Sequence, residues 1–343
     1  MTAGRTISSS RPGPGIRRPA VLILAAAFLL AILPTGCKPP PPEEILFRYQ
    51  FRPGEVLTYR VSLKGGGEVT MTMEEGGDEE DKISLPVRVE GSYLMEVGVE
   101  EVTPEGEAVL SLSYRDFQLT SVSRIREREM TALLTDRGLT ISEGDRVIKE
   151  AESGGEGYPL RGIAGEKFEF RVDNRGTILE SRTPPAPDRL FPSLQFDAFL
   201  ERMQPEFPRE PVPAGTSWTR TVAVPGPGLG RPWDQGERWS VEIDSTFQGF
   251  AGRGNRVARI VYAGDYRQES PGSGSGDRSG LSGSFHRLEG SYEFDLDAGR
   301  VLAGRSTLRQ TLDLKIAAEQ VLRGREIDIR VDDTMEVTVE LQQ

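Results

Sequence analysis

The carboxyl-terminal stretch alternates between apolar and polar residues, and this pattern constrains the fold more than any other feature. Every even position from Asp328 to Gln342 is polar or charged. Successive side chains of a strand point to opposite faces, so one face is buried and the other meets water, as in an antiparallel sheet. Asp333 interrupts the apolar face and predicts a bulge or a strand break. The apolar odd positions are Ile327, Ile329, Val331, Met335, Val337, Val339 and Leu341.

The same period of two recurs in residues 85–99, 239–247 and 308–316. A strand of about 16 residues spans roughly 50 Å, so we expect such strands either to be broken or to follow a strongly curved sheet. Turn-forming residues separate the runs, as a chain of antiparallel strands requires. These turns are Thr103–Gly106, Asp173–Gly176 and Asp297–Gly299.

The chain also repeats itself weakly. An aromatic-rich strand followed by an Asp- and Gly-containing turn occurs twice, and each copy is preceded by a small-residue turn that leads into another strand. Order and rough spacing agree, which favours a duplicated β unit; chance similarity between hairpins is the alternative. The matched stretches are 168–179 with 292–302, and 53–61 with 214–222.

One segment has the pattern of a helix. Apolar residues recur at helical spacing between Ser193 and Met203, with Ser193 placed to cap the first turn and Pro205 to end the last. The predicted fold class is therefore mainly β, with two related antiparallel β units (curved sheets, half-barrel or sandwich-like) joined by a short helical connector. The predicted units are residues 45–190 and 214–343, and the connector is 191–213.

Residues 1–36 have the organisation of a targeting segment and are excluded from the fold. Four arginines come first, and then an uncharged apolar run extends from Ala20 to Leu33. That run is shorter than the ~20 apolar residues of a membrane-spanning helix. Small residues then lead to Cys37, the only cysteine of the chain.

The stretch from Leu33 to Cys37 resembles the lipobox of bacterial lipoproteins. Gly36 and Cys37 match the last two positions of that motif, while Pro34 stands where the family usually has an apolar residue such as Leu. The resemblance implies a signal peptide over 1–36, cleavage before Cys37 and attachment of acyl groups, palmitate among them, to its thiol. An ordinary secretory signal, with Cys37 incidental, is the alternative.

A linker of residues 37–44 follows, and its proline run predicts a stiff spacer. Lys38 stands where an Asp would, in the enterobacterial sorting pattern, retain a lipoprotein at the inner membrane. The resemblance therefore implies the cell envelope as the location, facing the periplasm or cell surface, with the outer membrane favoured over the inner.

Composition excludes several functions. Without residues 1–36 the chain has 38 Lys and Arg against 53 Asp and Glu, a formal net charge of −15. A surface that acidic repels phosphate backbones, so nucleic acid is not an expected partner. One Cys and one His exclude an internal disulfide and any His- or Cys-rich metal site. We predict no cofactor and no metal.

The candidate chemical motifs are weak. Asp295-x-Asp297-x-Gly299 resembles part of a calcium loop, but further ligands are missing, and a hairpin turn is the preferred interpretation. His286 has serines nearby, yet there is no nucleophile elbow around them. Trp233 follows a Pro- and Gly-rich loop and is a candidate contact residue. None of these motifs predicts an enzyme.

The sequence therefore predicts a lipid-anchored bacterial envelope protein with a non-catalytic binding or structural role. Its expected partners are the membrane, through the anchor, and an envelope protein or an apolar ligand. A first alternative is a carrier that holds an apolar ligand such as lipid on the concave face of a half-barrel. A second is a hydrolase without a recognisable motif. The single predicted site residue is Cys37, as the lipidation site.

Overall fold

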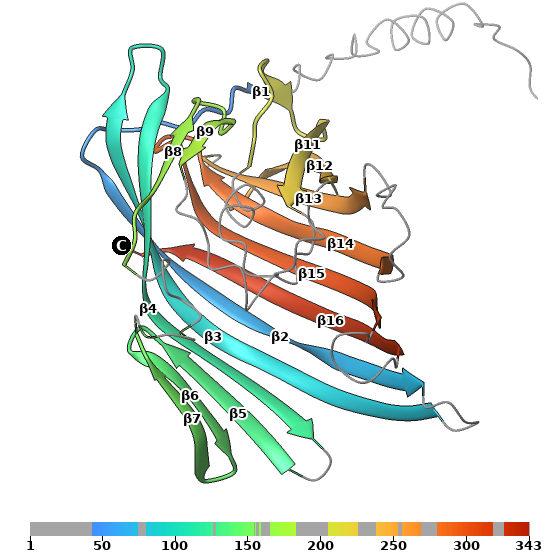
Figure 1. Cartoon of the computed structure of the whole chain (residues 1–343). Coiled ribbons are helices and arrows are strands. Elements are labelled where there is room, and N and C mark those ends of the chain that lie inside the picture. The colour runs from blue at the N-terminus through green and yellow to red at the C-terminus, as the bar shows by residue number, and fades with distance from the viewer. Residues whose placement is uncertain are drawn as a thin grey trace, which may run out of the picture. The chain divides into compact units, whose positions relative to one another are not determined.

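A computed structural model of the chain describes residues 43–74, 80–125, 128–153, 155, 158, 165–182, 205–225, 238–252, 256–268, 280–317 and 326–342 (Figure 1). They belong to one unit, which begins at Glu43. Within this part of the chain no helix is long and apolar enough to cross a membrane.

Strands make up the regular structure of the described residues. Their bounds are β1 Glu44–Ile45, β2 Val56–Glu74, β3 Glu80–Val102, β4 Ala108–Ile125, β5 Arg128–Thr135, β6 Gly138–Glu143, β7 Arg146–Glu152, β8 Phe168–Val172, β9 Ile178–Arg182, β10 Val212–Pro213, β11 Ser217–Pro225, β12 Arg238–Phe250, β13 Val257–Gln268, β14 Gly280–Asp295, β15 Arg300–Ala317 and β16 Glu326–Leu341.

Most of these strands form one curved sheet (Figure 1). Twelve follow one another in the order β11-β12-β13-β14-β15-β16-β2-β3-β4-β5-β6-β7, the β8–β9 hairpin joins at β4, and β1 pairs separately with β10. All pairings are antiparallel. The prediction of a mainly β, antiparallel fold is confirmed. The predicted helix from Ser193 to Met203 lies outside the described residues.

The longest strands are continuous. β16 pairs with β15 on one side and with β2 on the other, without a register shift beside Asp333, which lies between Gln310 and Gly67. The predicted bulge or break at Asp333 is therefore wrong. Gly67 carries no side chain, so Asp333 faces the bare backbone of β2 and not a large apolar group. The turns predicted at 103–106, 173–176 and 297–299 are confirmed as hairpin turns.

Glycines let neighbouring backbones approach closely in the middle of β2 and β3. A Cβ added to Gly66 would lie 2.8 Å from the carbonyl oxygen of Val87, and one added to Gly67 or Gly91 would collide with the backbone of the adjacent strand. Glycine in a strand interior often marks such close backbone approach. These glycines account for tight strand packing where a long sheet bends.

β4 changes partner halfway along its length. Its first part, Ala108–Leu112, pairs with β8, and its second part, Gln118–Ile125, pairs with β5. Between them β4 has one extra residue relative to β3, at Asp116, whose φ is 56°. The buried side chains therefore change from even positions, such as Tyr114, to odd positions, such as Phe117. Figure 1 shows β5–β7 and the β8–β9 hairpin leaving β4 in different directions.

Two apolar cores lie on the inner face of the sheet. Both sit toward the end at which β2 begins and β16 ends, which we call the packed end. The first core contains Tyr59, Val61, Leu63, Tyr93, Met95, Val99, Ala108, Leu110, Leu112, Tyr114, Phe117, Leu134, Tyr158, Phe168, Phe170, Val172, Val337 and Val339. The second contains Phe47, Phe207, Val212, Val241, Ile243, Phe247, Ala258, Ile260, Tyr262, Leu288, Tyr292 and Phe294.

Candidate functional site

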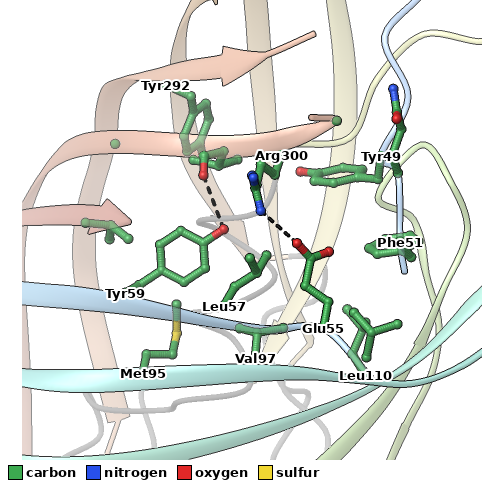
Figure 2. A pocket seen from close by; sticks show the side chains of 16 residues that line it. Tyr49, Phe51, Glu55, Leu57, Tyr59, Met95, Val97, Leu110, Tyr292 and Arg300 are labelled. Carbon is green, nitrogen blue, oxygen red and sulfur yellow. Dashed lines mark hydrogen bonds and ion pairs between the residues drawn. The ribbon is translucent and has the colours of Figure 1, made fainter. Parts of the chain in front are cut away.

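A cavity of about 110 Å³ lies between the two cores at the packed end. Strands from both ends of the sequence meet there, because β2 and β3 lie beside β16 and β15. Figure 2 shows aliphatic side chains on one side of the cavity and aromatic rings around the rest. The lining residues are Tyr49, Gln50, Phe51, Glu55, Leu57, Tyr59, Met95, Val97, Val99, Leu110, Tyr292, Gly299, Arg300, Val301, Gly304 and Val339.

One ion pair stands at the edge of this apolar lining. Arg300 Nη1 donates to Glu55 Oε1 at 2.8 Å, and the two side chains are 30% and 23% exposed. Among the described residues Arg300 Nε has no hydrogen-bond partner although it is buried. Backbone hydrogen bonds at Val99 fix the position of Glu55: Gly54 N–H donates to the Val99 carbonyl, and Val99 N–H donates to the Glu55 carbonyl, each at 2.8 Å.

Tyrosines complete the wall of the cavity. The Tyr59 hydroxyl donates to the Val301 carbonyl at 3.2 Å, and the Tyr49 hydroxyl donates to the Pro205 carbonyl at 3.0 Å. Burial raises the pKa of Tyr49, Tyr59 and Tyr292, because a phenolate would lose its hydration there. These side chains therefore stay neutral. The charged side chains of the lining are Glu55 and Arg300, which have opposite signs.

The segment between β1 and β2 closes the packed end. Tyr49 N–H donates to the Asn174 carbonyl at 2.7 Å, and Gln50 N–H donates to the Gly299 carbonyl at 3.1 Å. The segment thus bonds to the β8–β9 turn and to the β14–β15 turn. Phe47 enters the second core, where its ring stacks on that of Phe207 at 5.0 Å.

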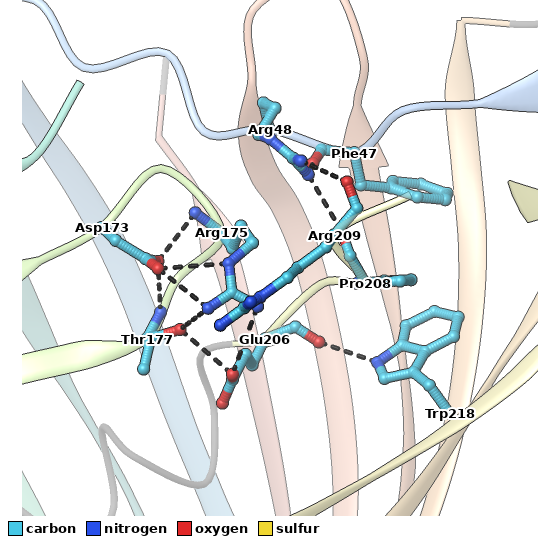
Figure 3. Close-up of polar contacts among 9 residues, drawn as sticks. All are labelled: Phe47, Arg48, Asp173, Arg175, Thr177, Glu206, Pro208, Arg209 and Trp218. Carbon is cyan, nitrogen blue, oxygen red and sulfur yellow. Dashed lines mark hydrogen bonds and ion pairs between the residues drawn. The ribbon is translucent and has the colours of Figure 1, made fainter. Parts of the chain in front are cut away.

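A polar cluster holds residues 205–209 against the β8–β9 turn, and we call it the clasp (Figure 3). Arg175 pairs with Asp173 at 3.1 Å and approaches Glu206 at 3.9 Å. Thr177 donates through its hydroxyl to Glu206 at 3.0 Å, and Phe207 N–H donates to the Arg175 carbonyl at 2.9 Å. The clasp consists of Asp173, Arg175, Thr177 and Glu206, and its contacts are structural.

Further contacts extend the clasp on both sides (Figure 3). Arg48 donates to the carbonyls of Pro208 and Arg209 at 3.0 and 2.6 Å. Trp218 Nε1 donates to the Glu206 carbonyl at 2.8 Å. Burial alone would raise the pKa of Asp173, but the N–H groups of Thr177 and Arg175 and the charge of Arg175 outweigh it and lower that pKa.

Away from the packed end, the inner face of the sheet is apolar again beyond the row of Asp333 and Gly67. Val331, Val69 and Leu85 lie side by side on β16, β2 and β3, and the next row is Ile329, Met71 and Ile83. The register is unbroken, so these six residues share the face of the first core. We call them the far-end rows. Each is half-buried, and among the described residues none belongs to either core.

The outer face behind the far-end rows is polar. Thr70, Ser84 and Arg330 alternate with the row residues, and Ser84 and Arg330 are exposed. The sheet therefore presents two faces of different chemistry to its surroundings at this end. An apolar face that is half-buried and extends past its own core is typical of a surface that meets a ligand or a partner.

The residues singled out from the sequence do not converge on the cavity. Cys37 and Trp233 lie outside the described residues, and His286 lies within β14 opposite Gln310. Asp295 accepts the N–H groups of Asp297 and Ala298, each at 2.9 Å, which confirms the hairpin-turn interpretation. No group of three His, Cys, Asp or Glu side chains within the described ranges is arranged to hold a metal.

Sequence reasoning missed the cavity residues. Glu55 and Arg300 are separated by 245 positions, and each is one charged residue at the start of a strand in a chain with many. The only sequence signal near this pair is the weak repeat, because Glu55 lies in the first copy of the small-residue turn. Of the far-end rows, by contrast, Leu85, Ile329 and Val331 are apolar positions that the period of two identifies.

Comparison with known proteins adds little. No protein-family model matches the chain, and no curated protein matches it either. Among solved structures it is similar to one titled "Lipid-protein interactions in lipovitellin", with a TM-score of 0.42 and 11% identity over 86% of this chain and 26% of that chain. OccK11 (OpdR) of Pseudomonas aeruginosa aligns with a TM-score of 0.11 and 8% identity over 86% of this chain and 99% of that chain. Likeness at this level carries no conclusion about function.

Proposed function

We propose that this protein is a lipid-anchored protein of the bacterial cell envelope that binds an apolar ligand, of the lipid class, along the far-end rows of its sheet. One observation carries the proposal: the inner face continues with six half-buried apolar side chains past the cores that it builds. A bound hydrocarbon chain would remove this surface from water. Each Å² of apolar area removed stabilises the complex by about 25 cal/mol.

The proposed role is binding without catalysis. The sequence carries no nucleophile elbow or metal-ligand spacing, and the charged residues that line the cavity form a mutually neutralising pair. Residues 1–37 support the proposed location, because four arginines, an uncharged apolar run and Cys37 stand in the order of a lipoprotein signal. Lys38 after the cysteine favours the outer membrane.

The binding proposal is tested on protein produced from Lys38 onward. Native mass spectrometry of this protein should show an added mass that lipid extraction removes and identifies. Leu85→Glu places a carboxylate in a far-end row, and because a buried unpaired charge is costly we expect at least ten-fold weaker binding of a fluorescent fatty acyl probe.

Ser84→Glu is the matched control, since Ser84 is the neighbouring residue of β3 and is exposed on the outer face. It should leave binding unchanged. Equal loss in both variants, or protein that carries no lipid and takes up none, would contradict the proposal.

The anchor is tested in cells. Radiolabelled palmitate should enter the full chain and not a Cys37→Ser variant. Label in neither protein, or the same label in both, would remove the anchor from the proposal and leave simple export.

We further propose that the sheet arose from two related β units. In support, the turn before β2 and the turn before β11 make the same pair of backbone hydrogen bonds. Gly54 N–H donates to Val99, which donates back to Glu55; Gly215 N–H donates to Phe247, which donates back to Thr216. Bulges follow both acceptor residues, in β3 and in β12.

A further inference from the structure

The cavity at the packed end combines a partly open apolar interior with a charged edge. Leu57, Val97 and Leu110 line one side, while Glu55 and Arg300 form the ion pair at 2.8 Å. Native interiors are packed tightly enough that an apolar space of this size is uncommon. At about 110 Å³ it is somewhat smaller than the ~150 Å³ engineered cavity that admits benzene.

Its size limits the occupant. The engineered cavity that admits benzene is larger, so the enclosed space takes a group smaller than benzene, such as a short alkyl chain. Water is a poor occupant beside the aliphatic wall, because a buried water needs two to four polar partners. A short alkyl group fits the space, and a complete lipid does not.

The ion pair limits the charge of the occupant. An anion that approaches Arg300 meets the carboxylate of Glu55, and a cation that approaches Glu55 meets the guanidinium of Arg300. Either charge would also be removed from water in an apolar space, which is unfavourable without a free counter-charge. A neutral group can accept a hydrogen bond from the edge of the cavity without these costs.

We propose that this cavity is a second binding site, which takes a small neutral amphiphile: an alkyl group of about three to five carbons that carries an uncharged acceptor such as an ester. The alkyl group occupies the side lined by Leu57, Val97 and Leu110, and the acceptor faces the ion pair. This site is separate from the far-end rows and does not depend on the function proposed for them.

Three probes of one chain length test the proposal: methyl butyrate, butyrate and butylammonium. They are titrated into the full chain held in lipid nanodiscs, with the methionine methyl groups labelled with ¹³C. Met95 lines the cavity, so its methyl resonance reports occupancy. We expect methyl butyrate to shift this resonance with half-saturation below about 10 mM, and the two ions to bind at least ten-fold more weakly.

Two variants make the test specific. Val97→Phe fills the cavity and should abolish the shift, whereas Val56→Phe, at a residue of β2 that is 61% exposed and outside the lining, should not. Glu55→Gln removes the negative charge and keeps the shape, so that Arg300 is left to favour an anion. Butyrate should then bind at least ten-fold more tightly than it does to the unaltered protein.

Every outcome of these titrations either supports the proposed site or contradicts it. No shift of the Met95 resonance with any probe would overturn the site. Butyrate binding as well as methyl butyrate to the unaltered protein, or no gain for butyrate in Glu55→Gln, would overturn the role of the ion pair. If Val97→Phe fails to fold, the change of selectivity in Glu55→Gln still tests the location.

Discussion

The ring of Phe47 lies parallel to the ring of Phe207, with 5.0 Å between centroids and 19° between planes. Both side chains are fully buried, and both meet Phe294. Neither ring comes from one of the long strands. The packed end is therefore closed by two connecting segments that the sheet holds in place through aromatic contacts.

Replacing one of these rings should weaken the whole fold. We expect Phe207→Ala to lower the free energy of unfolding by about 3–5 kcal/mol, since a buried ring is lost and a cavity is left behind. Urea denaturation followed by far-ultraviolet circular dichroism measures the change. Leu46→Ala, at a side chain that is 50% exposed, is the control and should cost under about 1 kcal/mol. Similar costs for both variants would show that the packed end is loosely held.

Strand glycines should differ in their tolerance of a methyl group. A Cβ on Gly67 would meet the backbone of Asp332 and Asp333, whereas one on Gly98 would meet the Ser111 hydroxyl at 2.7 Å. A hydroxyl can rotate away and a paired backbone cannot. We expect Gly67→Ala to cost about 1–3 kcal/mol and Gly98→Ala clearly less, by thermal denaturation. The reverse order would refute the close approach of β2 and β16.

The clasp should lose strength in acid. Because the folded-state pKa of Asp173 is lowered, its contribution is present above the unfolded-state pKa of about 3.9 and is lost as the pH falls through the folded value. Asp173→Asn should therefore cost about 1 kcal/mol at neutral pH, and the difference from the unaltered protein should shrink below about pH 4. Urea midpoints across pH 3–7 measure this, with the exposed Glu101→Gln as a variant without effect. A difference that does not change with pH would argue against an ionised Asp173.

Buried tyrosines should make the fold sensitive to alkali. Burial raises the pKa of Tyr93, so the phenol favours folding below the unfolded value of about 10 and opposes it increasingly as the pH rises further. We expect tyrosinate absorbance to appear together with unfolding and not before it. Tyr93→Phe should move the alkaline unfolding midpoint upward. Tyrosinate signal in protein with a native circular dichroism spectrum would show instead that these rings reach solvent.

Local patterns and long-range contacts differ in how far the sequence predicts them. The period of two identifies β16, most of β3 and their buried faces, because the alternation depends only on neighbouring positions. It does not predict that β16 pairs with β2, which joins the strands of both halves into one sheet. Asp333 shows the same limit: the interruption is visible in the sequence, but the facing Gly67 is known only once the register is known.

The candidate sites follow the same division. In the far-end rows, Leu85, Ile329 and Val331 could be predicted as apolar positions of strands. That they lie beyond the cores could not be predicted, since it depends on which segments cover the face. The pair of Glu55 and Arg300 could not be predicted, because each residue is one of many charges and their contact depends on the arrangement of four strands.

The pairing of β16 with β2 has a consequence for the order of events during synthesis. Val61 of β2 can pair with Val339 only after β16 has been synthesised, so the centre of the sheet forms late. Contacts between residues so distant in sequence make folding slow. Until then β2 and β15 each have an open edge that can pair with other chains. A chain of this topology therefore needs to be kept apart from its neighbours until β16 has emerged.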